Sequence, residues 1–564
     1  MPTIALHSRL HAPLIIAAAS CALLVNLGRP ALWDDDEPKN AACSLAMLES
    51  GDWLVPTFNG RLRVEKPVLA NWVQAAGFTL CGRNETGARI GSALLTIGTC
   101  LLTWQIGCRL LGPQAGFIGG LAMATCVWTA VGGRAATPDA PLVFCTTLAL
   151  WLFARGTAGG TRGLGVAAAI GIGAACGLAT LAKGPVGIAL PLASFVLFAS
   201  WQVRAGLAPT LTAAVGGLRL PIVLGAALVV AAPWYACVAY RTDGEWLRGF
   251  FLVHNVGRFA APMEGHAGSL LYYPCVVAVG LFPWSIVLLA MVAHAALALR
   301  HASTHPARPG VALLAAWAAV WIGAFSCAGT KLPGYVWPAY PALALATALF
   351  LVDWSRNAVT FAPLGSASVL ARLTVMRIAW VSLGLGGLVI AIGLPVTARL
   401  YAPGNEWLGI VGLVPIVAAI TAWRHDAAGD PARAIGALAA SACVVVTLLA
   451  GVATHRIGRG HGMREHVTEL AGAGPWACFW NVPPSLVYYA DAPVAKLDTA
   501  TEAARHLASH PQARLVVDSR HEHLVRPELP ADCRVLACIP TLGDRQYVVL
   551  GPPPRSDASL AHAP

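Results

Sequence analysis

The segment Trp33-Asp34-Asp35-Asp36-Glu37-Pro38 places four consecutive carboxylates directly after the first apolar stretch of the chain, residues 12–28. That stretch has the length that an α-helix needs to cross a bilayer. Carboxylates at this density are costly to keep beside hydrocarbon, so such residues usually have a function. The segment therefore predicts a charged functional site at the boundary of a membrane.

The composition of the whole chain indicates which structural class of protein it belongs to. Of the 564 residues, 57% are hydrophobic and only 12% are charged, which excludes a soluble globular protein. Stretches of spanning length recur at residues 12–28, 88–111, 113–132, 138–154, 163–181, 184–201, 219–239, 269–298, 310–328, 335–352, 373–395, 407–423 and 432–453. We expect about thirteen transmembrane helices, and hence an all-α polytopic membrane domain.

The distribution of arginine predicts the orientation. The first span is expected to be a retained anchor, because no small-residue cleavage site follows it. With the N-terminus in the cytoplasm, the short inner loops carry Arg155, Arg162, Arg204, Arg219, Arg300, Arg308, Arg356, Arg372, Arg424 and Arg433, as the positive-inside rule requires. Arg456, Arg459 and Arg464 oppose this orientation, because they follow the last span and would lie outside.

Two long outer loops and a tail complete the predicted organisation. Loop 29–89 is expected to hold interfacial helices at residues 39–50 and 68–81, and loop 241–268 has a similar pattern. Residues 1–454 form the predicted membrane domain. The tail, residues 455–564, is expected to be a small soluble α/β domain, with extended runs at 477–480, 486–489, 514–518, 535–539 and 546–550 and a helix at 501–509.

The sequence gives little indication of a cofactor, and none is expected to be required. It has no Gly-rich phosphate loop and no Cys or His spacing typical of a structural metal site. Glu65 and His254 are weak candidates for holding a divalent ion, because they come from separate loops. The net charge of +11 suits anionic lipid head groups, and no nucleic acid partner is expected. The chain is expected to act as a monomer.

Lysine is used sparingly. Only five of the 38 Lys and Arg residues are lysines, and Lys39, Lys66, Lys183 and Lys331 all fall on the predicted outer face. One interpretation is that these side chains extend to the membrane interface as snorkelling residues. The other is that they hold a phosphate, a role that compact ammonium groups perform well.

Carboxylates and cations on one outer membrane face favour a particular chemistry. Nucleotide sugars and ATP are absent from that side, so a transferred group must arrive on a lipid carrier. A polyprenyl phosphate leaves as an anion, which Lys or Arg can stabilise without a metal. A nearby carboxylate can deprotonate or position the acceptor, or stabilise positive charge on a sugar.

The motifs of the membrane region resemble a known family. These are Asp36-Glu37-Pro38, Leu48-Glu-Ser-Gly-Asp52-Trp53-Leu-Val-Pro56, Glu65-Lys66-Pro67, Trp72, Gly133-Arg134-Ala-Ala-Thr-Pro-Asp139, Ala182-Lys183-Gly-Pro and Lys331-Leu-Pro-Gly-Tyr335. In this order they are similar to the bacterial dolichyl-phosphate-mannose-protein mannosyltransferase-like superfamily of GT-C fold, and more closely to the aminoarabinose transferases of lipid A.

The resemblance implies an inner membrane enzyme with a periplasmic active site and a periplasmic C-terminal domain. Such enzymes move 4-amino-4-deoxy-L-arabinose from undecaprenyl phosphate onto lipid A phosphates, which confers resistance to polymyxin and cationic peptides. The candidate catalytic residues are Asp36, Glu37 and Asp139. The candidates for binding the donor phosphate are Lys66, Arg258, Lys183 and Lys331, and those for lining the substrate cavity are Glu65, His254 and Tyr335.

The motif Asp-Glu-Pro decides which aspartate of the acidic run matches the acidic position of the family. Three aspartates precede Glu37, and Asp36 is selected because it directly precedes Glu-Pro; Asp34 and Asp35 are expected only to solvate the turn. A lipid A phosphate is already anionic and needs a general base less than a hydroxyl does. Asp36 is therefore expected either to act as a base or to orient the acceptor or the donor amine.

Structural roles compete with these assignments. Asp36 and Glu37, or Asp139, could simply cap the helices that follow them. Glu65 could be only a partner for Lys66.

Two further site residues also have simple structural alternatives. His254 could be an ordinary solvated loop residue. Tyr335 could belong to an aromatic belt at the membrane surface.

Two alternative functions stay open. One is a related glycosyltransferase that uses another polyprenyl-linked sugar or a protein acceptor. The other is a transporter of a lipid-linked sugar, although the chain lacks a convincing internal repeat of the kind that transporters commonly have.

Overall fold

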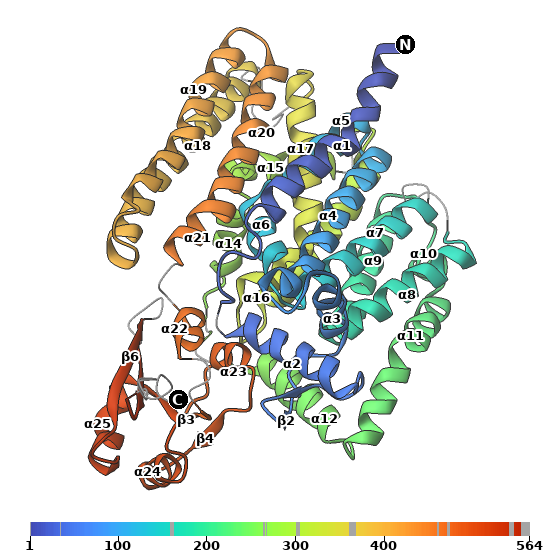
Figure 1. Cartoon of the computed structure of the whole chain (residues 1–564). Helices are drawn as coiled ribbons and strands as arrows, with labels where there is room; N and C mark the ends of the chain where they lie inside the picture. Colours follow the sequence, from blue (N-terminus) through green and yellow to red (C-terminus); the bar gives the residue numbers. More distant parts are fainter. Residues whose placement is uncertain are drawn as a thin grey trace.

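The computed structural model describes residues 2–33, 35–157, 163–262, 266, 268–300, 305–359, 368–458, 462–470, 474–540 and 546–553. Asp34, for which only a solvating role is predicted, lies outside the described residues. Figure 1 shows a bundle of long helices, with shorter helices and a small sheet gathered at one end of it. We call this end the outer end, because it contains the segment that follows the carboxylate run.

Nine described helical segments are long and apolar enough to cross a membrane. They comprise α4 (Glu85–Leu110), α8 (Val166–Lys183), α9 (Val186–Arg204), α10 and α11 (Leu211–Gly216, Leu220–Arg241), α16 (Arg308–Ser326), η3 and α17 (Pro333–Ala339, Tyr340–Ser355), α18 (Ser368–Tyr401), η5 and α19 (Glu406–Gly412, Leu413–Ala427), and α20, η6 and α21 (Pro431–Leu448, Leu449–Ala453, Thr454–Ile457). The predicted all-α polytopic domain is confirmed.

The other predicted spans are also helical, but they are not among these nine segments. They are α1 (Pro2–Leu24), α7 (Asp139–Gly156), the pair α5 (Pro113–Ala124) and α6 (Val127–Arg134), and the series α14 (Tyr272–Gly280), η2 (Trp284–Val287) and α15 (Leu288–Ala298). The helices α5 and α6 are bent by 56°. In the last series the break contains Pro283, a residue that lacks the N–H a continuous helix needs.

Interfacial elements cover the outer end, as predicted. The helices α2 (Asp36–Ser50) and α3 (Leu69–Cys81) pack together, and a hairpin of β1 (Thr57–Phe58) and β2 (Arg61–Leu62) joins them. Pro38 lies in the first turn of α2, where its missing N–H leaves no bond unmade. The second outer loop folds into α12 (Glu245–Arg248), the π-helix η1 (Gly249–Gly257) and α13 (Arg258–Ala260).

The tail contains a five-stranded mixed sheet in the order β4-β3-β5-β7-β6. Its elements are α22 (Met463–Glu469), β3 (Trp476–Phe479), α23 (Pro484–Ala490), β4 (Ala495–Leu497), α24 (Ala500–Ser509), β5 (Arg514–Asp518), η7 (Ser519–His521), α25 (Glu522–Val525), η8 (Arg526–Glu528), β6 (Arg534–Pro540) and β7 (Gln546–Gly551). The extended run predicted at residues 486–489 is wrong. It lies inside the helix α23, which begins with Pro484 at a first-turn position that suits proline.

The tail contacts the outer loop through a small polar network. The Tyr489 hydroxyl accepts a hydrogen bond from the Leu32 amide at 2.8 Å and donates one to Glu85 at 3.1 Å. Arg464 forms an ion pair with the same Glu85 carboxylate at 3.0 Å. In Figure 1 the tail accordingly lies beside α2, at the outer end of the bundle.

Candidate functional site

A small cavity of about 100 Å³ at the outer end brings together residues from distant parts of the chain. Its lining includes six of the residues selected from the sequence: Glu65, Lys66, Lys183, His254, Arg258 and Tyr335. Three of these carry cationic groups, and we call this space the cationic cavity. The remaining wall is largely apolar and aromatic, with Phe250, Phe259 and Phe325 among its residues.

The three cations come from a loop and from the ends of two helices. Lys66 lies in the loop before α3, Lys183 is the last residue of α8, and Arg258 begins α13. The turn after Lys183 depends on Gly184, whose φ is +80° and whose added Cβ would lie 2.5 Å from the Phe250 ring. A larger residue there would strain the backbone and collide with the cavity wall.

Asp139 stands at the first turn of α7 and forms an ion pair with the Lys183 ammonium. The same ammonium lies over the Tyr335 ring, 4.9 Å from its centroid, a distance typical of a cation–π contact. Arg258 donates a 3.4 Å hydrogen bond to the Tyr335 hydroxyl. Asp139 and Tyr335 therefore orient two of the three cations rather than serving only as helix cap and belt residue.

The Lys66 ammonium is held in an unusual electrostatic setting. Burial, together with the positive charges of Lys183 and Arg258, lowers its pKa to about 8, while the carboxylates of Asp36 and Asp139 oppose that shift. These four charged groups are thus close enough to Lys66 to influence its titration. A third carboxylate, that of Glu65 in the lining, is paired with Lys39 and Arg63. The three cations and the two remaining carboxylates therefore have a surplus of positive charge, which favours an anionic ligand.

Asp36 and Glu37 are neighbours in sequence but differ in environment. Asp36 is exposed, and among the described residues it makes no side-chain hydrogen bond or ion pair. Glu37 is only 5% exposed. A carboxylate that faces solvent beside Lys66 is available to a ligand, and a buried one is not.

Both oxygens of the Glu37 carboxylate accept hydrogen bonds from neighbouring groups. Arg89 binds both of its oxygens, at 2.9 and 2.6 Å, and the backbone amides of Trp33 and Ala136 each donate to it at 2.8 Å. Burial raises its pKa, but these partners outweigh that effect and the net pKa is lowered. The geometry favours a structural role for Glu37, tying α2 to α4 and to the segment before α7.

Two other candidates have partners that the sequence did not identify. Glu65 pairs with Lys39 at 2.6 Å and lies 3.4 Å from Arg63, so the alternative in which Glu65 is only a partner for Lys66 does not describe the observed pairing. Burial raises the pKa of Glu65, but the hydrogen bond and charge of Lys39 lower it to about 2 overall. Lys331 donates to the carbonyls that end α16, at Ser326 (2.8 Å) and Ala328 (2.9 Å), and does not line the cationic cavity.

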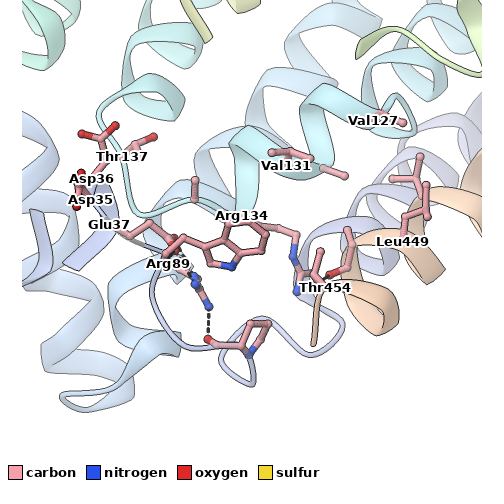
Figure 2. Close-up of a pocket in the computed structure, with 16 residues that line it drawn as sticks. Asp35, Asp36, Glu37, Arg89, Val127, Val131, Arg134, Thr137, Leu449 and Thr454 are labelled. Atoms are coloured by element: carbon pink, nitrogen blue, oxygen red, sulfur yellow. Dashed lines mark hydrogen bonds and ion pairs between the residues drawn. The ribbon is translucent and has the colours of Figure 1, made fainter. Parts of the chain in front are cut away.

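A second and larger cavity, of about 360 Å³, has Asp35, Asp36 and Glu37 of the carboxylate run in its lining. Figure 2 shows Asp35, Asp36 and Glu37 at one end of it, and Val127 and Leu449 at the other. Sequence reasoning did not identify this space, because α6 and η6 are more than three hundred residues apart. Arg134 also lines it, although the sequence singled out that residue only as part of a motif.

The described residues contain one group arranged like metal ligands: His294, His305 and Asp353. Both histidine Nε2 atoms lie 2.9 Å from the same Asp353 oxygen. The Nδ1 atom of His305 accepts a hydrogen bond from the Ala307 amide, so the neutral ring carries its proton on Nε2. The group is thus satisfied as a hydrogen-bonded triad, and it contains neither Glu65 nor His254.

Comparison with known proteins gives relatives over most of the chain. Residues 65–232 match the family described as dolichyl-phosphate-mannose-protein mannosyltransferase. The undecaprenyl phosphate-alpha-4-amino-4-deoxy-L-arabinose arabinosyl transferase of Pseudomonas paraeruginosa is 29% identical over 468 residues, covering 82% of this chain and 80% of the relative. The protein of the same name from Edwardsiella ictaluri is 31% identical and covers 56% and 54% of the two chains.

The fold has a close counterpart among solved structures. The crystal structure of ArnT from Cupriavidus metallidurans bound to undecaprenyl phosphate matches with a TM-score of 0.73 and 24% identity, covering 95% of this chain and 97% of that one. The apo form of the same protein matches with a TM-score of 0.71. The helical bundle, the interfacial elements and the tail therefore recur together as one fold.

Proposed function

We propose that this chain, a membrane glycosyltransferase of GT-C fold in the dolichyl-phosphate-mannose-protein mannosyltransferase-like superfamily, transfers 4-amino-4-deoxy-L-arabinose from undecaprenyl phosphate to a phosphate of lipid A. The observation that carries the proposal is the cationic cavity, where Lys66, Lys183 and Arg258 meet beside two carboxylates. The names of the relatives supply the sugar and the carrier.

The cationic cavity binds the phosphate of the donor. Lys66, Lys183 and Arg258 surround a space that suits a phosphate group, and each is a charge-assisted hydrogen-bond donor. When the bond between the sugar and the carrier breaks, undecaprenyl phosphate leaves with an additional negative charge. Preorganised cations stabilise that charge best in the transition state, and this is how they accelerate the reaction.

The transfer exchanges one bond for another at the anomeric carbon of the sugar. An oxygen of the lipid A phosphate forms the new bond to that carbon, and the bond to the undecaprenyl phosphate oxygen breaks with its electron pair. Because the acceptor oxygen is already anionic, no proton has to be removed. Asp36, exposed beside Lys66, is assigned to orient the sugar through its amine, and Asp139 to hold Lys183 on the departing phosphate.

The location follows from the same proposal. A lipid-linked donor is needed where nucleotide sugars are absent, so the outer end faces the periplasm and the chain lies in the bacterial inner membrane. Residues 1–454 are assigned as the transmembrane transferase domain and residues 455–564 as a periplasmic domain. The hydrogen bonds of Tyr489 to the outer loop support placing the tail on the same side as the cationic cavity. Added amine on lipid A would then confer resistance to polymyxin.

The experiment is transfer by purified protein in lipid nanodiscs, with undecaprenyl-phosphate-linked aminoarabinose as donor and lipid A as acceptor. Lys66→Met is expected to reduce transfer at least about a hundredfold, while Lys66→Arg retains part of it because the charge remains. Lys496→Met in the tail is the matched control, since among the described residues that ammonium is paired with Asp498 and does not line the cationic cavity. Donor consumption with a protein acceptor alone, or movement of intact donor across the bilayer, would contradict the proposal.

A further inference from the structure

The larger cavity next to the carboxylate run has no part in donor binding as described above. It shares no lining residue with the cationic cavity, yet both adjoin Asp36: that residue lines the larger cavity and acts electrostatically on Lys66. Asp36 therefore belongs to the lining of the larger space and its charge acts on a cation of the smaller one. One is cationic and small, and the other is long and mainly apolar.

The walls of the larger cavity suit a hydrocarbon chain. Val127, Ala130 and Val131 of α6 form one side, and residues of α20 and η6, including Val446 and Leu449, form the other. Figure 2 shows these two elements facing one another, with the carboxylates beyond the far end of α6. We call this space the α6–α20 groove. An apolar chain in it would carry its head group at the Asp36 end.

One charged side chain of the groove, Arg134, has no carboxylate paired with it among the described residues. Arg134 is 8% exposed, and its Nη1 donates to the carbonyls of Ala22, Leu23 and Val25 at the end of α1. Among the described residues, its Nη2 has no hydrogen-bond partner and no carboxylate forms an ion pair with it, although the charge of Glu37 acts on it. Figure 2 shows the side chain extending from α6 in the direction of Thr454.

A buried cation bonded only to neutral carbonyls is costly unless an anion approaches it. The nearby Glu37 carboxylate does not serve, because Arg89 already binds both of its oxygens. The groove therefore combines apolar walls with a buried guanidinium that is not paired with a carboxylate among the described residues, and Asp35 and Asp36 also belong to its lining. Those two properties match a phosphorylated acyl lipid.

We propose that the α6–α20 groove is the binding site of the acceptor lipid, with an acyl chain along α6 and η6 and a lipid phosphate on the guanidinium of Arg134. This assignment rests on the proposed function, because it presumes two lipid substrates. The donor phosphate has its own three cations in the cationic cavity. A second lipid phosphate needs a separate positive charge outside that cavity, and Arg134 supplies it.

The test uses full-length protein in detergent and two variants of the groove. Val131→Trp fills the space from a half-exposed position (49%), and Arg134→Gln removes the charge while keeping most of the side-chain volume. Val389→Trp on α18 is the matched control, because Val389 is 70% exposed and does not line the groove. Thermal stability is measured alone, with lipid A, and with undecaprenyl phosphate. KM is then measured separately for the acceptor and the donor.

Both groove variants are expected to lose the thermal shift that lipid A gives and to keep the one that undecaprenyl phosphate gives. The KM for lipid A should rise at least about tenfold, as expected when a charged hydrogen bond is lost, with the donor KM unchanged. Loss of the undecaprenyl phosphate shift instead would assign the groove to the donor chain and overturn the inference. A lipid A shift retained in both variants would also overturn it. Failure of the wild-type protein to modify lipid A at all would be a different result, against the proposed function itself.

Discussion

Lys66 gives the sharpest prediction, because its ammonium should lose its proton within an accessible pH range. Burial and the charges of Lys183 and Arg258 lower its pKa to about 8, whereas an ordinary lysine titrates near about 10.4. With a pKa of about 8, the charged fraction falls from about 0.9 at pH 7 to about 0.1 at pH 9. If only the charged form binds the donor phosphate, kcat/KM for the donor should fall about tenfold over that interval.

The sign of the effect follows from the chemistry of the group. Lysine is positive when protonated, so donor binding is complete below the lowered pKa and is lost as the pH rises through it. Removing Asp36 takes away a negative charge that holds the pKa up. Asp36→Asn is therefore expected to shift the alkaline fall to lower pH, in addition to any loss of rate.

The assay is the initial rate of sugar transfer at donor concentrations well below KM, between pH 6 and pH 10. Lys66→Arg should abolish the alkaline fall, because a guanidinium stays charged throughout that range. Lys496→Arg, a surface substitution in the tail, should keep the wild-type profile. If wild type and Lys66→Arg lose activity together above pH 8, the titrating group is not Lys66 and the reasoning is refuted.

Three further predictions concern other contacts of the outer end. Glu37→Gln should lower the free energy of unfolding by about 3–5 kcal/mol, because it leaves buried Arg89 without its partner. Thermal unfolding in detergent measures this loss, and an unchanged midpoint would contradict the prediction. Asp139→Asn should reduce kcat at least about tenfold with a smaller change in donor KM, because Lys183 loses the carboxylate that orients it. Steady-state kinetics measure both constants, and full activity of this variant would contradict the role of Asp139 in orienting Lys183. Tyr489→Phe should weaken the attachment of the tail to the outer loop by about 1–2 kcal/mol, because the phenol hydroxyl makes two hydrogen bonds there. Limited proteolysis should therefore cut near residue 470 faster than in the wild type, and equal rates would refute this prediction.

The helical bundle and its interfacial layer could be predicted from the sequence because their signals are local. Runs of apolar residues define spans, and Pro38 marks the start of α2. The breaks were harder to predict. The 56° bend between α5 and α6 depends on how the surrounding helices pack, which no local pattern contains. The run at residues 486–489 has β-forming residues, yet it is helical in α23, which packs against α2.

For the candidate site, too, local motifs could be predicted from the sequence, whereas contacts between distant segments could not. Motifs identified the cations that meet in the cationic cavity, since lysine is otherwise rare in this chain. They could not separate Asp36 from Glu37, because only the fold brings Arg89 to the second carboxylate. Likewise, the capping role of Lys331 and the pairing of Glu65 with Lys39 depend on contacts between segments. The α6–α20 groove was beyond prediction, as it forms between helices far apart in the sequence.

The most direct test of the account is the mass spectrum of lipid A from bacteria that lack their own aminoarabinose transferase but make the donor. Expression of the wild-type chain should add the mass of aminoarabinose to lipid A, and Lys66→Met at equal membrane abundance should not. Lipid A without that addition in cells expressing the wild-type chain, or full addition with Lys66→Met, would contradict the central claim that the cationic cavity performs this transfer.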